Sequence, residues 1–244
     1  MGGYRSRRSA GLLLPYDART GQPWSLTGSL LASTVLYFGL YLAVAAAGAA
    51  ASLALGVDAW IAESGGFVFL PMLLAVFGLG VLINRSVGQV GRQILLGALL
   101  LLVLSPFLGL AVAVAAATHP AALASAALAV GGSVVVTAAI AWISPWDLSR
   151  LGGLALVALV GLVVMQLLGW FLAPVLGLVT SPVWYFIGTL VFALYLVVDL
   201  SRLKVAMAYG PNEALAAFLG LALALDVINL FLYLLAFFGG GSRR

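Results

Sequence analysis

Apolar stretches separated by short polar breaks run along most of the sequence. A helix needs about 20 consecutive apolar residues to cross the ~30 Å hydrocarbon core of a bilayer. Seven stretches reach or approach that length, so the pattern predicts an all-α integral membrane protein with seven membrane-spanning helices. The predicted spans are Leu30–Gly56, Phe67–Asn84, Ile94–Ala117, Ala121–Ile143, Leu151–Leu172, Pro182–Leu200 and Glu213–Phe238.

Proline marks several of the breaks between these spans. Thr118–Pro120, Ser144–Asp147 and Gly210–Asn212 each contain one, which is typical of helix ends and turns. A six-span arrangement, in which one segment is re-entrant, is the main alternative. Residues 1–29 are interpreted as a basic tail and residues 239–244 as a short C-terminal tail, on either side of a transmembrane domain of residues 30–238.

Composition excludes a soluble or disordered chain. Hydrophobic residues make up 64% of the sequence and charged residues 7%, against about 25% charged in ordinary soluble domains. Cysteine is absent and His119 is the single histidine, so disulfides, thiolate sites and paired-histidine metal sites are excluded. We therefore expect no resident metal or cofactor and no nucleic-acid partner, and we expect a lipid bilayer around the chain.

The basic residues predict the orientation, because Lys and Arg favour cytoplasmic loops. With seven spans, nine of them fall on the side of the N-terminus and two on the other side. The N-terminus is then cytoplasmic and the C-terminus outside, whereas six spans would place the last two arginines inside as well. The nine are Arg5, Arg7, Arg8, Arg19, Arg85, Arg92, Arg150, Arg202 and Lys204, and the two are Arg243 and Arg244.

Two acids fall inside predicted spans, Asp199 near the end of the sixth and Asp226 deep in the seventh. A charged side chain at the bilayer centre costs at least ~2.5–3.5 kcal/mol on insertion scales, so each indicates a functional site with a partner. The turn around Pro211-Asn212 lies midway between them in sequence. An antiparallel hairpin about that turn would place both carboxyl groups at one depth, roughly 20 Å from the turn.

Two carboxyl groups at one depth in a low dielectric are expected to share a proton. The pair therefore predicts a pH-responsive gate or a proton relay. Two other interpretations stay open. The pair could be a neutral, hydrogen-bonded tie between two helices, or Asp199 could pair with Arg202 one helical turn away.

Other polar residues could belong to the same site. Asp226, Asn229 and Tyr233 recur at i, i+3 and i+7, which predicts a polar stripe facing the bundle or a wet cavity. Arg85 ends the second span and could reach inward to a carboxylate or extend to the lipid headgroups. From the residues alone, the headgroup position is favoured.

Three segments resemble the Bax inhibitor-1 family, also called the transmembrane Bax inhibitor motif family. Asp226–Leu235 (DVINLFLYLL) is similar to the family's final-helix signature, Tyr195–Ser201 to its sixth helix, and Asp147–Gly152 to the loop that opens its fifth helix. The order and lengths of the predicted spans agree with the family over roughly residues 30–238. The final-helix segment is the most specific of the three.

The resemblance implies a bacterial seven-helix bundle with the last helix in the centre. It implies a calcium-leak channel of the inner membrane whose state depends on pH, with Asp199 and Asp226 as the sensor. An arginine ending the second helix pairs with the first aspartate in the family, so the resemblance favours Arg85 as its partner.

Departures from the family lower the cation affinity that we expect. The second span has no acid, and the charged C-terminal tail of the family is reduced to GGGSRR. Asp199, Asp226 and Asn229 are the deep side chains that could line a cation path. Because Ca²⁺ prefers six to eight oxygen ligands, these residues predict at most weak and transient binding.

Three other classes of membrane protein are alternatives for this sequence: a protease, a transporter and a regulator without transport. An intramembrane aspartyl protease needs Tyr-Asp and Gly-x-Gly-Asp, and the sequence has Val198-Asp199 and Leu225-Asp226 instead. We therefore assign no catalytic residue and expect no enzyme activity. A secondary transporter is disfavoured because no inverted repeat is visible. The strongest alternative is a regulator, without transport, of a membrane protease or another membrane partner.

Overall fold

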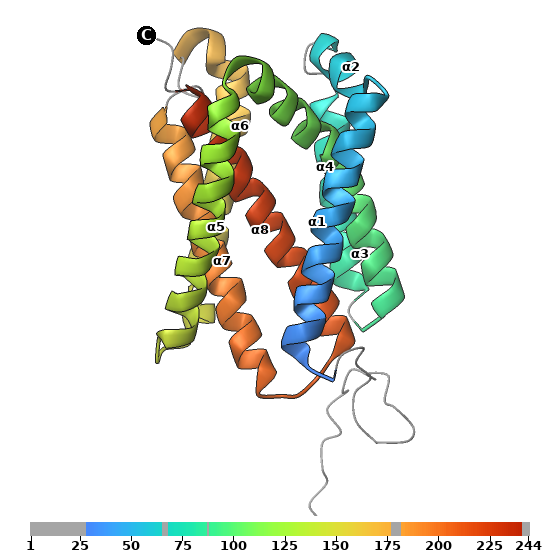
Figure 1. Cartoon of the computed structure of the whole chain (residues 1–244), viewed down its shortest axis with the longest axis vertical. Coiled ribbons are helices and arrows are strands. Elements are labelled where there is room, and N and C mark those ends of the chain that lie inside the picture. The colour runs from blue at the N-terminus through green and yellow to red at the C-terminus, as the bar shows by residue number, and fades with distance from the viewer. Residues whose placement is uncertain (1–27, 65–67, 87, 177–181, 241–244) are drawn as a thin grey trace, which may run out of the picture.

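The computed structural model describes residues 28–64, 68–86, 88–176 and 182–240, so most of both predicted tails lies outside it. These ranges fold into helices and contain no strand (Figure 1). The helices are α1 (Leu30–Ala54), α2 (Val57–Glu63), α3 (Phe69–Arg85), α4 (Val90–Thr118), α5 (Pro120–Ile143), η1 (Leu148–Leu151), α6 (Gly152–Leu176), α7 (Pro182–Met207) and α8 (Glu213–Gly240).

Each predicted span overlaps one apolar helix, which confirms an all-helical membrane protein. Six helices, α1 and α4 to α8, are long and apolar enough to cross a bilayer. The remaining one, α3, has 17 residues and a length of about 25 Å, which is short for a ~30 Å hydrocarbon core. The structure therefore establishes six helices of crossing length and a shorter apolar one.

The end of the sixth predicted span is the largest difference at a helix boundary. The apolar pattern ends at Leu200, but α7 continues to Met207 and includes Arg202 and Lys204. Both cations have protein partners: Arg202 binds Asp199, and Lys204 donates to the carbonyl oxygens of Ala141, Trp142 and Ser144 at 2.8–3.2 Å. A cation whose charge is met inside the bundle does not have to end the helix.

Local signals fix the turn between α7 and α8. Gly210 has a φ of +88°, a conformation that residues with a Cβ rarely adopt. The Asn212 side chain accepts a hydrogen bond from the Leu215 amide at 3.0 Å, which caps the first turn of α8. The break predicted at Gly210–Asn212 therefore holds a glycine turn followed by an N-cap.

The last helix lies in the centre of the bundle, as the resemblance implies. In Figure 1, α8 crosses the middle of the molecule obliquely, between α1 and α4 on one side and α5 and α7 on the other. Half of its most apolar stretch is buried, the largest share among the six crossing helices. The approach to α1 is close at Gly220, where a Cβ atom would meet backbone atoms of Thr34 and Phe38.

Candidate functional site

The two intramembrane aspartates meet where α7 packs against α8. Asp199 and Asp226 are 3% and 6% exposed, and their carboxyl groups lie within hydrogen-bonding reach of one another. The carboxyl oxygen Oδ2 of Asp226 has no hydrogen-bond partner within the described part of the chain. The structure therefore brings together the two acids that the turn arithmetic places at one depth.

The two helices reach this meeting point over different lengths. Asp199 lies eight residues, about 12 Å, before the end of α7, whereas Asp226 lies thirteen residues, about 20 Å, after the start of α8. Non-helical residues 208–212 make up the difference on the side of α7. Asp199 is consequently only two helical turns from the end of its helix.

That short distance lets a cation on the same helix reach Asp199 from the surface. Arg202 Nη1 donates to Asp199 Oδ1 at 2.6 Å, a short charge-assisted hydrogen bond. The Arg202 side chain is 44% exposed and the Asp199 side chain 5% exposed. The local ion pair, one of the interpretations left open by the sequence, is the pairing that the structure contains.

The pairing of Arg85 with Asp199 is not present in the structure. Arg85 ends α3 with its side chain exposed, and no ion pair joins it to a carboxylate in the described ranges. The physical reason is position: α3 packs mainly against α4, while Arg202 lies one turn from Asp199 on α7. Arg85 has the exposed position that the residues alone favoured.

The predicted polar stripe on α8 is split between two faces of the helix. Tyr233 lies on the α7 side, where its ring packs against Gly188 and, at 5.5 Å between ring centroids, against Phe192. Asn229 faces α1 and α4 and donates from Nδ2 to the Leu225 carbonyl at 2.8 Å. Asn229 is rotated about the helix axis by about 60° from Asp226 and by about 40° from Tyr233, which on a central helix is enough to change neighbours.

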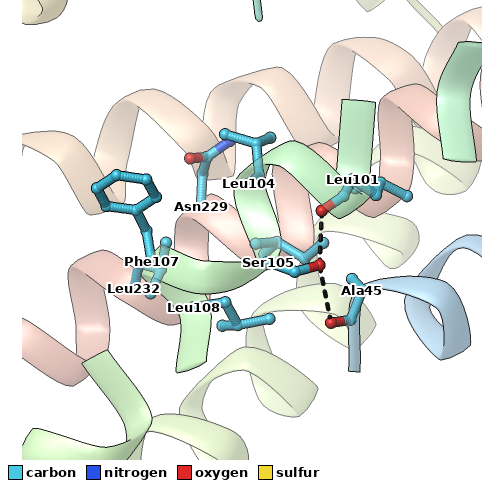
Figure 2. Close-up of a pocket in the computed structure, with 9 residues that line it drawn as sticks. Ala45, Leu101, Leu104, Ser105, Phe107, Leu108, Asn229 and Leu232 are labelled. Carbon is cyan, nitrogen blue, oxygen red and sulfur yellow. Dashed lines mark hydrogen bonds between the residues drawn. The ribbon is translucent and has the colours of Figure 1, made fainter. Parts of the chain in front are cut away.

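Asn229 lines a small cavity of about 50 Å³ between α1, α4 and α8 (Figure 2). Across from it, Ser105 Oγ lies 2.6 Å from the Leu101 carbonyl and 3.2 Å from the Ala45 carbonyl. The cavity can hold a few water molecules but is mostly apolar. No group of three or more His, Cys, Asp or Glu that could hold a metal ion occurs among the described residues.

Sequence reasoning missed a buried acid at the start of α8. Glu213 is 1% exposed, and its Oε2 accepts a hydrogen bond from Ser33 Oγ at 3.1 Å. The Tyr37 hydroxyl is also within hydrogen-bonding reach of Glu213. Acids are common in the first turn of a helix, so the position of Glu213 did not indicate that it is buried. The signal in the sequence was the pair Ser33 and Tyr37, two hydroxyl groups one turn apart on α1 that can bind a buried acid.

Comparison with known families fits this geometry. A family model described as inhibitor of apoptosis-promoting Bax1 matches residues 27–243, nearly the whole chain. The chain belongs to the Bax inhibitor-1 family. No curated protein matches it. In this Bax inhibitor-1 family member, two carboxyl groups are buried between α7 and α8. One guanidinium, that of Arg202 on α7, binds the pair through Asp199.

Proposed function

We propose that this multi-pass membrane protein is a pH-sensitive calcium leak channel, or a leak channel for cations more generally, gated by Asp199 and Asp226. The observation that carries the proposal is the imbalance of charge at the pair. Two carboxyl groups lie buried in contact, and one guanidinium faces them. One guanidinium neutralises one carboxylate, so the closed pair needs a proton on the other.

The gate follows from what that proton does. While it is present, Asp226 and Asp199 share a hydrogen bond across the α7–α8 contact, and the helices stay packed. When it leaves, two carboxylates face each other in an apolar setting and repel at short range. The α7–α8 contact then loosens, and the two carboxylates become oxygen ligands for a passing cation.

Asn229 supplies the next oxygen ligand along α8. It lies one turn beyond Asp226 and opens onto the cavity between α1 and α4. With so few oxygen ligands, the path passes Ca²⁺ with weak and transient binding and needs no resident metal. In this proposal the protein sits in a bacterial inner membrane with its N-terminus in the cytoplasm, and no residue is catalytic.

The test is calcium flux into proteoliposomes across a pH series. Wild-type flux is expected to rise as the pair loses its proton. Asp199→Asn and Asp226→Asn are each expected to abolish that pH dependence, because neither variant can form two facing carboxylates. Glu63→Gln is the matched control, since Glu63 is an exposed acid on α2. Unchanged flux and pH dependence in both aspartate variants would contradict the proposed gate.

The alternative function makes the opposite prediction in the same preparation. A regulator of a membrane protease or of another membrane protein would give no flux after reconstitution. It would instead co-purify with a membrane partner from its native membrane. Absent flux together with such a partner would replace the channel proposal.

A further inference from the structure

Arg202 forms a polar link between the surface of the molecule and the buried pair. Its side chain is 44% exposed at one end, while Nη1 binds Asp199, whose side chain is 5% exposed. Asp199 therefore meets the water-exposed surface through a guanidinium that already occupies its Oδ1 atom.

A glycine makes room for this arginine. A Cβ atom built on Gly152, the first residue of α6, would lie 2.6 Å from Arg202 Nη2 and 3.6 Å from Val198 Cγ1. The backbone φ at Gly152 is −56°, an ordinary helical value, so conformation does not require glycine there. Glycine matters there for the position of Arg202, because the guanidinium lies against the Gly152 backbone and would have to shift to make room for a methyl group.

The neighbouring glycine offers a natural comparison. Gly153 is exposed, and a Cβ atom there would meet nothing within 4 Å. Gly152 and Gly153 are adjacent at the start of one helix, but only Gly152 lies against the Arg202 guanidinium.

No other cation competes for Asp199 in the described part of the chain. Helices α1, α5 and α6 contain no Asp, Glu, Lys or Arg, and α8 contains two acids, Asp226 and Glu213, of which Glu213 accepts a hydrogen bond from Ser33 on α1. On α7, Tyr195 interacts electrostatically with both aspartates, and Lys204 binds carbonyl oxygens at the end of α5. In the η1 region, Arg150 pairs with Asp147 at 3.7 Å.

The segment with η1 that precedes Gly152 is not itself a neutral-pH switch. The hydrogen bond from the Ser149 hydroxyl holds the pKa of Asp147 below its usual range. Asp147 therefore stays ionised and keeps capping η1 at every pH where an ordinary aspartate is ionised. A change in the contacts of Arg202 near neutral pH would therefore come from the buried aspartate pair and not from Asp147.

We propose that Arg202 is a tethered blocking cation, and that Gly152 is the residue that positions it. The guanidinium occupies the approach through which a divalent cation such as Ca²⁺ would reach Asp199 from this end of the bundle. Entry requires the cation to displace the guanidinium. This inference rests on the proposed channel function and names how the same site is regulated.

The test uses Arg202→Gln, Gly152→Ala and the control Gly153→Ala in the full chain. Flux of Ca²⁺ into proteoliposomes is the first measurement. The second is labelling of the Asp199 peptide by a hydrophobic carbodiimide, which reacts with protonated carboxyl groups, as a function of pH. At a pH alkaline enough to ionise the pair in every variant, where the gate is open, we expect Arg202→Gln and Gly152→Ala to raise flux several-fold. We also expect both variants to move the labelling curve to higher pH by about one unit or more, because the carboxylate loses its cation. Gly153→Ala is expected to match the wild type in both.

The double variant separates displacement of Arg202 from simple damage to the fold. Once position 202 carries glutamine, the guanidinium that a methyl group at position 152 would strike is gone. Gly152→Ala is therefore expected to add little to Arg202→Gln in flux or labelling, a non-additive result. Additive effects would overturn the assignment of Gly152.

The outcomes also distinguish this inference from the function beneath it. Normal wild-type flux, with Arg202→Gln and Gly152→Ala matching Gly153→Ala in both measurements, would overturn the blocking role alone. Absent wild-type flux would contradict the channel itself. The blocking role would fall with it, whatever the labelling curves show.

Discussion

Charge at the buried pair is governed by which arginine reaches it. Asp199 lies two turns from the end of α7, so a cation one turn further along bridges the carboxylate and the surface. Arg85 has to extend from α3, which packs mainly against α4, and its side chain is exposed. Asp199 therefore pairs with Arg202, which lies one turn away on the same helix, and not with Arg85, the partner that the family resemblance implies.

Substitution of Arg85 tests this assignment. We expect Arg85→Gln to leave the pH dependence of calcium flux unchanged and to alter stability by no more than about 0.5 kcal/mol, as for other exposed side chains. Arg202→Gln, which removes the same charge from the pair, is the comparison. A shift of the flux–pH curve in Arg85→Gln and none in Arg202→Gln would show that Arg85 is the working partner.

Residue by residue, the sequence predicts the acids better than their surroundings. Scarcity of charge singles out Asp199 and Asp226, and the turn between their helices pairs them. Scarcity of charge does not single out Glu213, because an acid at the start of a helix is common. Its burial against α1 is visible only in the structure. Which face Asn229 takes depends on the tilt of α8 between its neighbours, and periodicity along one helix does not contain that tilt.

Helices are predictable here because the bilayer fixes their length and the breaks carry turn residues. The differences arise where tertiary contacts extend an element, as at the end of α7, where Lys204 donates to three carbonyl oxygens around the end of α5. How the helices pack depends on side-chain size at each crossing. Gly220 on α8 is the clearest example, since it lies against the α1 backbone.

The crossing at Gly220 gives a prediction about stability. A Cβ atom there would lie 2.7 Å from Tyr37 Cβ, 2.9 Å from Phe38 N and 3.0 Å from Thr34 O. Because backbone atoms cannot move aside cheaply, we expect Gly220→Ala to destabilise the protein by about 1–3 kcal/mol. Thermal unfolding in detergent measures it.

Gly131→Ala is the matched control for this crossing. Gly131 is a mid-helix glycine on α5 with nothing within 4 Å of an added Cβ. We expect this variant to be as stable as the wild type or more so, since alanine loses less backbone entropy than glycine in a helix. Equal melting temperatures for the two variants would contradict a close α1–α8 crossing.

For the whole molecule, the central position of α8 would couple the proposed gate to the bundle. α8 packs against α1, α4, α5 and α7, so the proposed loosening at Asp226 would change its contacts with helices on both sides. Figure 1 places the start of α1 and the α7–α8 turn at one end of the bundle and the end of α8 at the other. The orientation of these two ends relative to the membrane stays a prediction.

Cysteine mapping tests the orientation directly, because the natural sequence contains no cysteine. The two probes are Tyr209→Cys and Ser242→Cys. Tyr209 is 83% exposed in the α7–α8 turn, and Ser242 belongs to the C-terminal tail. With seven spans, an impermeant maleimide added to intact cells should label position 242 and spare position 209. Labelling of neither, with both labelled after lysis, would indicate six spans.

The central claim is that a proton shared by Asp199 and Asp226 holds the channel closed. Asp226→Asn tests it most directly, because asparagine keeps the shape of the protonated acid and carries no charge at any pH. The measurement is calcium flux through this variant in proteoliposomes, from acidic to alkaline pH. The account predicts flux that stays at the low acidic level of the wild type throughout. A variant whose flux still rises with pH as the wild type does would contradict it.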